Sequence, residues 1–356
     1  MKKTLNKTKI ADFATYIGVV IAFIVMNALM NEGLLTRSMK GQLVPICCYI
    51  VMAVSLNLTV GILGELSLGH AGFMSVGAFT GVVTAMSLQS AIPSDGVRLA
   101  LAIVMGAIFA GIAGTLVGIP VLRLHGDYLA IVTLAFGEII KELINCLIIG
   151  HDENGLHIIF NATGAKTVTD LGLTETGKVL IKGAQGATGT DTIASFTAGF
   201  ILIMVTLVVV LNLARSRSGR AIMALRDNRI AAESVGINVT KYKLMAFVTS
   251  AALAGGAGAL YGLNFSHLVS SKFDFNTSIL ILVFVVLGGL GNMWGSIIAA
   301  AVLTVLPEAL RGFADYRMLI YAIVLIVVML ATNSPQMKAL LSKLVPFGKK
   351  GEKEHA

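Results

Sequence analysis

Two ionisable side chains lie three positions apart inside an apolar stretch of the sequence. Glu138 and Lys141 fall in the segment 128–149, which is otherwise rich in apolar residues. A charge within hydrocarbon is unfavourable unless it meets protein, water or an opposite charge. Residues three apart share a helix face, so these two can neutralise each other. We expect the pair near the middle of a membrane span, facing the bundle interior, where it either lines a water-filled path or forms a buried structural ion pair.

A second polar group lies within the glycine-rich stretch 61–81. Six glycines interrupt this apolar sequence, and Glu65, Ser67 and His70 lie among them. Small residues let helix backbones approach closely, so tight helix packing alone can explain the glycines. The ionisable residues favour a helix that is broken beside a translocation path, with Gly69 as a further residue of the break. No metal site is predicted at His70, because no partner ligand lies at a suitable spacing.

A third group of small residues divides the apolar region 277–310. Gly288, Gly289, Gly291 and Asn292 lie close together in this region. The region is either one over-long helix or two shorter spans joined by a turn at these glycines. We treat the four residues as further candidates for a helix break beside the path.

The segment 214–243 carries seven Lys and Arg residues against two acids. Such loops remain in the cytoplasm. Arg220 to Asp227 predicts a short helix, and Asn228 can cap a second one that Gly236 closes. A plain basic loop would explain the charges but not the caps, so we interpret this segment as a cytoplasmic docking surface. Its candidate residues are Arg220, Arg226, Asn228, Arg229, Ala231, Ala232, Glu233 and Gly236.

The elements that position these groups are predicted to be membrane-spanning helices. The chain has 356 residues, of which 56% are hydrophobic and only 13% charged, whereas a soluble domain carries about a quarter charged residues. The net charge of +8 reflects basic cytoplasmic segments and not nucleic-acid binding. The three cysteines lie in apolar segments and predict neither a disulfide nor a metal site. We find no phosphate-binding loop and no catalytic motif, so any ATPase must be a separate chain.

Apolar runs long enough to span a membrane predict an all-α helix bundle of ten spans. The basic N-terminus and the basic tail 334–356 are both expected in the cytoplasm, which requires an even number of crossings. We expect one transmembrane domain over 1–356, two inverted five-span halves, and an extracytoplasmic loop at 150–191. The first run is interpreted as an uncleaved span, because no small-residue cleavage site follows it. The runs are 14–30, 43–63, 66–89, 98–122, 128–149, 192–213, 244–264, 277–290, 293–310 and 318–332.

Four ordered motifs resemble the M-type permease subunit of branched-chain amino-acid importers of the ATP-binding cassette (ABC) class. The resemblance extends from the second predicted span to about Thr332. It implies that 214–243 is the coupling loop of such permeases, although Glu233 follows its two alanines here and no Leu-Pro comes after. The motifs are GELSLGHAGFMSVGAF at 64–79, RLHGDYLAIVTLAFGEI at 123–139, SGRAIMALRDNRIAAESVGIN at 218–238 and GGLGNMWGSIIAA at 288–300.

The resemblance also implies partners and an activity. The partners are an H-type permease subunit, two ATP-binding cassette subunits that hold ATP and Mg, an extracytoplasmic amino-acid-binding protein and membrane lipid. The chain itself binds no cofactor. It would move leucine, isoleucine or valine across the cytoplasmic (inner) membrane by alternating access.

Other functions remain open at this point. A urea-type permease shares this architecture, although YLAIVTLAFGE at 128–138 is more similar to the amino-acid branch. An ion-coupled secondary transporter would use Glu138 and Lys141 as ion sites. A scaffold without transport is disfavoured by the charges inside the spans and by the glycine breaks.

Overall fold

The computed structural model describes residues 2–33, 36–122, 126–152, 155–161, 168–173 and 177–310, and the single positions 319, 322, 323 and 326. The chain divides into two compact units, Met1–Ala301 and Val302–Ala356. The first unit contains the glycine-rich stretches, the basic segment and the Glu138–Lys141 pair. The predicted tail 334–356 lies outside the described residues.

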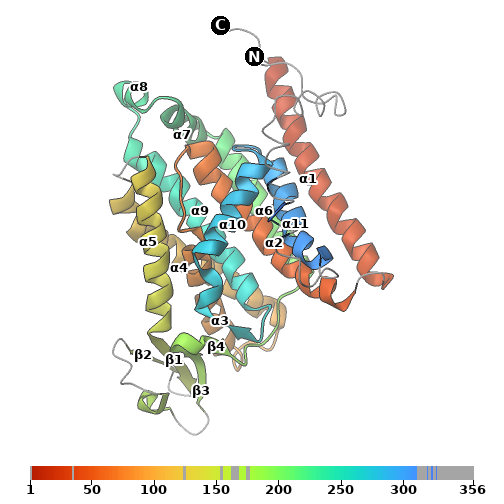
Figure 1. Ribbon diagram of the computed structural model, residues 1–356, viewed down its shortest axis with the longest axis vertical. Helices are drawn as coiled ribbons and strands as arrows, with labels where there is room; N and C mark the ends of the chain where they lie inside the picture. The colour runs from red at the N-terminus through yellow and green to blue at the C-terminus, as the bar shows by residue number, and fades with distance from the viewer. Residues whose placement is uncertain are drawn as a thin grey trace. The chain divides into compact units, whose positions relative to one another are not determined.

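Helices form most of the described structure (Figure 1). Five of them are apolar and long enough to cross a membrane. These are the part Phe13–Asn31 of α1, α2 together with its extension η1, and the helices α4, α6 and α9. Several apolar helices of this length indicate a multi-pass membrane protein. The helices are α1 (Lys2–Asn31), α2 (Arg37–Asn57), α3 (His70–Ser87), α4 (Asp95–Val121), α5 (Asp127–Asn145), α6 (Phe196–Arg215), α7 (Arg217–Asp227), α8 (Arg229–Ser234), α9 (Val239–Gly262), α10 (Phe275–Gly288) and α11 (Met293–Ala309).

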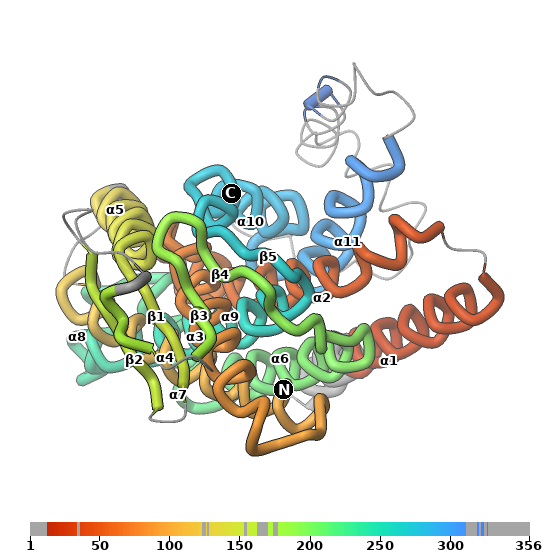
Figure 2. The backbone as a smooth tube through the Cα atoms, turned by 90° about the horizontal axis from the view of Figure 1, so that it is seen from below, coloured from red at the N-terminus to blue at the C-terminus, as the bar shows by residue number. Residues whose placement is uncertain are grey.

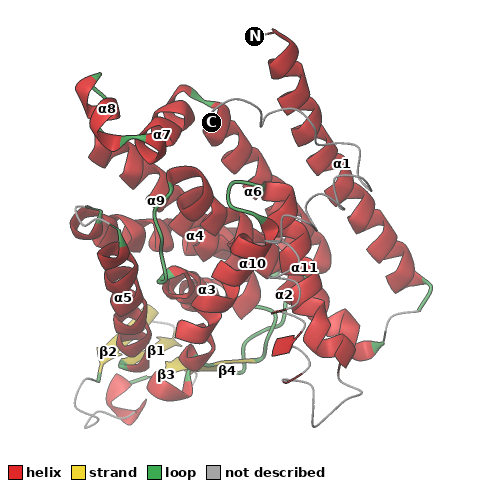
Figure 3. Ribbon diagram, turned by 45° about the horizontal axis from the view of Figure 1, so that its top comes forward, coloured by secondary structure: helices red, strands yellow, loops and turns green. Residues whose placement is uncertain are grey.

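The core is centred on α9, which packs against α3 and α4. Glycines let these helices approach closely, because a Cβ placed on Gly77 of α3 would overlap the backbone of Gly255 in α9. One turn further along α9, Gly258 meets the carbonyl of Met74 in the same way. Figure 3 shows the helices of the bundle, with the strands gathered at one end.

A small antiparallel sheet lies at the end of the bundle opposite α7 and α8 (Figures 1 and 2). The strands follow the order β2-β1-β3-β4-β5. The all-α prediction is therefore wrong in the region between α5 and α6. The strands are β1 (Leu147–Asp152), β2 (Gly155–Phe160), β3 (Lys178–Lys182), β4 (Ala187–Thr188) and β5 (His267–Leu268).

The sheet explains why α5 ends before the predicted boundary. The predicted span 128–149 includes Leu147–Ile149, but α5 ends at Asn145 and these apolar residues belong to β1. In β2, intermediate and exposed side chains alternate along the strand, as in a sheet with one face covered. Three consecutive apolar residues at the start of β1 thus extended the predicted helix by about one turn.

The first nine predicted runs each overlap a described helix. The tenth, 318–332, lies mostly outside the described residues. In the run 66–89 the helix begins only at His70. The ten-span count and the two inverted halves stay predictions.

Candidate functional site

The basic segment folds as the two short helices that the sequence predicts. The side-chain oxygen of Asn228 accepts a hydrogen bond from the Ala231 amide at 3.0 Å, which caps α8. Gly236 follows α8 with a φ of +85°, and its amide donates to the Glu233 carbonyl at 3.0 Å. Both local predictions are confirmed, because the capping groups are near neighbours in the sequence.

This α7–α8 segment has its own small core and an exposed apolar face. Leu225, Ala232 and Val239 pack together beneath it. Ile230 and Val235, in contrast, are 79% and 76% exposed. Neither residue was predicted from the sequence. The available signal was that Ile230 lies within the polar, capped helix α8 and Val235 directly follows it.

The charged residues of the segment point in different directions. On α8, Arg229 Nε and Glu233 Oε1 form an ion pair at 3.2 Å. Arg220 is exposed and donates to the Arg215 carbonyl at 3.2 Å. Arg226 instead reaches into the bundle, where its Nη1 donates to the Gly61 carbonyl at 2.8 Å.

The stretch that Arg226 contacts is a break between α2 and α3. After α2 the chain forms one π-helical segment, η1 (Leu58–Leu63), and then Gly64 adopts a φ of +80°. Residues 64–69 are not helical, and α3 begins at His70. The amides of Gly64 and Glu65, at the start of the break, both donate to the Thr59 carbonyl. A π-helical turn inside a helix is often found at functional sites.

Residues of the break are held by α5 on one side. Ser67 is buried, and the next amide, of Leu68, donates to Thr133 Oγ1 of α5 at 3.1 Å. A Cβ on Gly69 would overlap the Thr133 carbonyl. The close approach of this unwound segment to α5 therefore requires glycine at position 69.

His70 is a buried residue with a hydroxyl partner. Its Nε2 lies 2.8 Å from Ser55 Oγ, and Ser250 Oγ donates to the Ser55 carbonyl at 2.6 Å. These contacts join the start of α3 to α2 and α9. Within the described ranges no group of three His, Cys, Asp or Glu residues is placed to hold a metal.

Glu65 pairs with a residue that the sequence placed in the basic segment. Lys243 Nζ forms an ion pair with a Glu65 carboxylate oxygen. The two side chains are 5% and 15% exposed, so the pair is enclosed by protein. The contact joins the start of α9 to the break, and nothing in the sequence indicated it because the partners are 178 positions apart.

The second glycine-rich group forms a turn between α10 and α11. Asn57, at the entrance of η1, accepts from the Gly291 amide and donates to Ser296 Oγ, both at 2.8 Å. A Cβ on Gly61 would overlap the Gly291 amide. The two glycine-rich stretches thus meet, and Gly288 ends α10 where one long helix was the alternative. Gly289 and Asn292 complete the turn, since the Asn292 amide donates to the Gly289 carbonyl at 3.0 Å.

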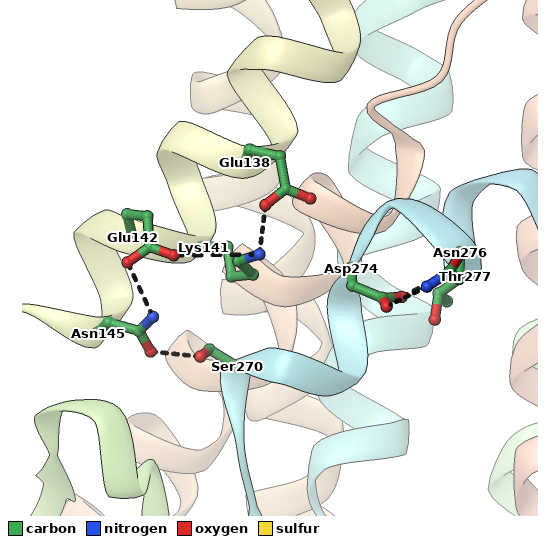
Figure 4. Close-up of polar contacts among 8 residues, drawn as sticks. All are labelled: Glu138, Lys141, Glu142, Asn145, Ser270, Asp274, Asn276 and Thr277. Atoms are coloured by element: carbon green, nitrogen blue, oxygen red, sulfur yellow. Dashed lines mark hydrogen bonds and ion pairs between the residues drawn. The ribbon is translucent and has the colours of Figure 1, made fainter.

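The predicted Glu138–Lys141 ion pair forms. Both residues lie in the second half of α5, and Lys141 lies one turn before its end at Asn145. Their depth in a membrane stays a prediction. The pair lies on the side of α5 that faces η4 (Ser270–Phe273) and α10 (Figure 4). Lys141 is 20% and Glu138 39% exposed, so the pair is only half-buried.

Further polar contacts surround this pair (Figure 4). Lys141 Nζ also lies 4.0 Å from Glu142 Oε1. Asn145 at the end of α5 accepts from the Ser270 hydroxyl. Asp274 caps α10 by accepting from the Thr277 amide at 2.9 Å. The result is a polar cluster at the sheet end of α5 and α10.

A family model described as the permease component of branched-chain amino acid transport systems matches residues 38–330. The chain belongs to this family. It is 34% identical over 292 residues to the high-affinity branched-chain amino acid transport system permease protein LivM of Escherichia coli, covering 79% of this chain and 66% of that protein. The chain thus spans just under two thirds of that relative's length. No solved structure matches.

Two other relatives show how far the similarity extends. The permease protein LivH of Salmonella typhimurium is 22% identical over 289 residues, covering 79% of this chain and 88% of LivH. The ribose import permease protein RbsC of Haemophilus influenzae is 32% identical over 123 residues, covering 32% of this chain and 38% of RbsC. The resemblance of the four sequence motifs to M-type permeases is confirmed.

In this permease the predicted residues fall into two groups. The break (Glu65, Ser67, Gly69, His70), the glycine turn and part of the α7–α8 segment are connected by direct contacts. Glu138 and Lys141 form a separate ion pair on α5, whose Gly137 packs on Gly69 of the break. Of the remaining predicted motif residues, Arg123 lies outside the described residues.

Proposed function

We propose that this chain is a permease subunit of an ATP-driven importer and moves branched-chain amino acids across the cytoplasmic membrane by alternating access. Membership of the permease family and the similarity to LivM support the substrate class. The partner subunits would be an H-type permease similar to LivH, two ATP-binding cassette chains that hold ATP and Mg, and an extracytoplasmic binding protein.

The observation that carries the proposal is the exposed apolar face of α7–α8. Ile230 and Val235 project from a segment rich in arginine and lysine, which belongs in the cytoplasm by its charge. Exposed apolar residues surrounded by polar ones are typical of protein interfaces. This face, with the Arg229–Glu233 pair at its edge, would dock on the ATP-binding subunits.

The charges at the two ends of the bundle support one orientation of the chain in the membrane. The sheet region 150–191 has three lysines against five acids, whereas 214–243 has seven basic residues against two acids. By the positive-inside rule the sheet would face the exterior and the binding protein, with both termini in the cytoplasm. Ten spans in two inverted halves are compatible with this arrangement.

An ion-coupled transporter is less well supported. That alternative rested on charges near the middle of a span, whereas the pair lies in the second half of α5, with Lys141 one turn before the end of the helix. A half-buried pair beside the sheet fits the outer mouth of a path better than an ion site in the membrane centre.

Uptake of labelled leucine by cells that express this chain with its co-encoded partners tests the proposal. Excess unlabelled isoleucine or valine should compete, and urea or ribose should not. Cells that lack this chain but keep its partners are the matched control. Uptake of urea or ribose in place of leucine would contradict the substrate, and leucine uptake that survives depletion of ATP would contradict the mechanism.

A further inference from the structure

The non-helical break between α2 and α3 is tied to both the α7–α8 segment and the glycine turn. We propose that η1 is the element through which movement of α7–α8 reaches the break at 64–69, with Arg226 and Lys243 as its positioning residues. This inference rests on the proposed function, because it concerns how ATP-driven movement reaches the path.

Two cationic side chains hold the exit of η1. Arg226 Nη1 donates to the Gly61 carbonyl at 2.8 Å, and the aliphatic stem of Arg226 covers Gly64 so closely that a Cβ there would overlap it. Lys243, at the start of α9, pairs with Glu65 directly after the turn. Any displacement of α7 or of the start of α9 must therefore move residues 61–65 or break these contacts.

The entrance of η1 is held by different elements. Asn57 bonds the Gly291 amide and Ser296 Oγ at the α10–α11 turn, both at 2.8 Å. Gly61, whose carbonyl accepts from Arg226, also packs directly on Gly291. The π-helical turn therefore lies between the α10–α11 turn on one side and Arg226 and Lys243 on the other.

A π-helical turn is suited to this task. It interrupts the regular hydrogen-bond ladder, and here the amides of Gly64 and Glu65 compete for one acceptor, the Thr59 carbonyl. Shifting these bonds by one residue would change the length and direction of the exit without unfolding α2. With two alternative bonding patterns at the exit of η1, a small displacement of α7–α8 can switch residues 64–69 from one position to another.

The break passes movement on to neighbouring helices. The Leu68 amide bonds Thr133 Oγ1 of α5 at 3.1 Å, and the Ala71 amide bonds Ser278 Oγ of α10 at 3.2 Å. A shift of 64–69 therefore reaches the two helices that carry the polar cluster of Figure 4.

Stabilisation of the fold alone does not explain why Glu65 and Lys243 form an enclosed ion pair. Enclosed ion pairs are often replaceable by neutral residues without loss of stability, provided that both charges are removed together. The double variant Glu65→Gln/Lys243→Met should therefore fold. Arg226→Met keeps the stem over Gly64 and removes the bond to Gly61 together with the exposed ion pair between Arg226 and Asp227.

The test measures ATP hydrolysis and leucine uptake by the complete importer in proteoliposomes. For the double variant and for Arg226→Met, the ATP-binding subunits should co-purify as they do with the wild type. ATP hydrolysis should persist, while leucine transported per ATP falls about ten-fold, the size of a typical coupling between sites. Arg226→Lys, which keeps a donor, should restore most of that ratio.

Arg98→Met is the control, because the Arg98 side chain is as little exposed as that of Lys243, 6% against 5%, and pairs with Asp95 and Asp191 instead of with the break. It should lower the amount of importer without changing leucine per ATP. A wild-type ratio in both the double variant and Arg226→Met would overturn the role of η1. If the double variant does not accumulate, Arg226→Met alone decides. A wild-type importer that shows no ATP-driven uptake would overturn the proposed function, and the role of η1 with it.

Discussion

Single glycines decide how closely α3 and α9 approach. Gly77 faces Gly255, and Gly258 faces the Met74 backbone, so these crossings have no room for a Cβ. The sequence predicts such packing from its glycines, but it does not show which glycine meets which helix. Lys243 and Glu65 show the same limit. Each was visible as a charge, whereas their pairing depends on the fold that joins positions 178 residues apart.

Gly77→Ala should destabilise the permease. The added methyl would overlap the backbone of Gly255, which cannot move aside as a flexible side chain could. Overpacking of this kind costs about 1–3 kcal/mol. Thermal unfolding of purified protein measures the effect. Gly96→Ala is the control, because nothing lies within 4 Å of its added methyl. Equal unfolding temperatures for the two variants would contradict the packing argument.

Elements were predictable where their signals are local. Long apolar runs indicated the helices, and Asn228 and Gly236 indicated the ends of α8. The sheet was missed because its strands have two to six residues and are held by partners distant in the chain, such as β4 with β5. The exposure of Glu138 and Lys141 was not predictable for the same reason, because it depends on how η4 and α10 pack against α5.

Ile230→Asp should weaken docking of the ATP-binding subunits. The side chain is almost fully exposed on α8, so the change should leave the permease folded while it places a charge in an apolar contact. Loss of a central apolar contact costs on the order of 1–2 kcal/mol, or about ten-fold in affinity. Co-purification with the ATP-binding subunits measures this. Ile230→Leu keeps the apolar contact and should bind normally, whereas undiminished binding of Ile230→Asp would place the interface elsewhere.

The first unit of the molecule separates its charges between its two ends. The basic α7–α8 segment and the sheet lie at opposite ends of the bundle (Figure 1), and α6 is the helix that connects them in the chain. If α6 crosses the membrane once, the two ends face different compartments. The proposed transport requires this separation, because the binding protein and the ATP-binding subunits act on opposite sides.

Labelling with a membrane-impermeant thiol reagent tests this orientation. Glu142→Cys, beside the sheet, should react in intact cells, and Ile230→Cys should react only after the cells are permeabilised. Both native positions are exposed, so access and not burial decides the reaction. Cys47 and Cys48 are buried and can stay, but Cys146 is half-buried near Glu142 and must first become serine. The Cys146→Ser parent without added cysteine gives the background. Labelling of Ile230→Cys in intact cells would place α7–α8 outside, where it could not meet ATP-binding subunits.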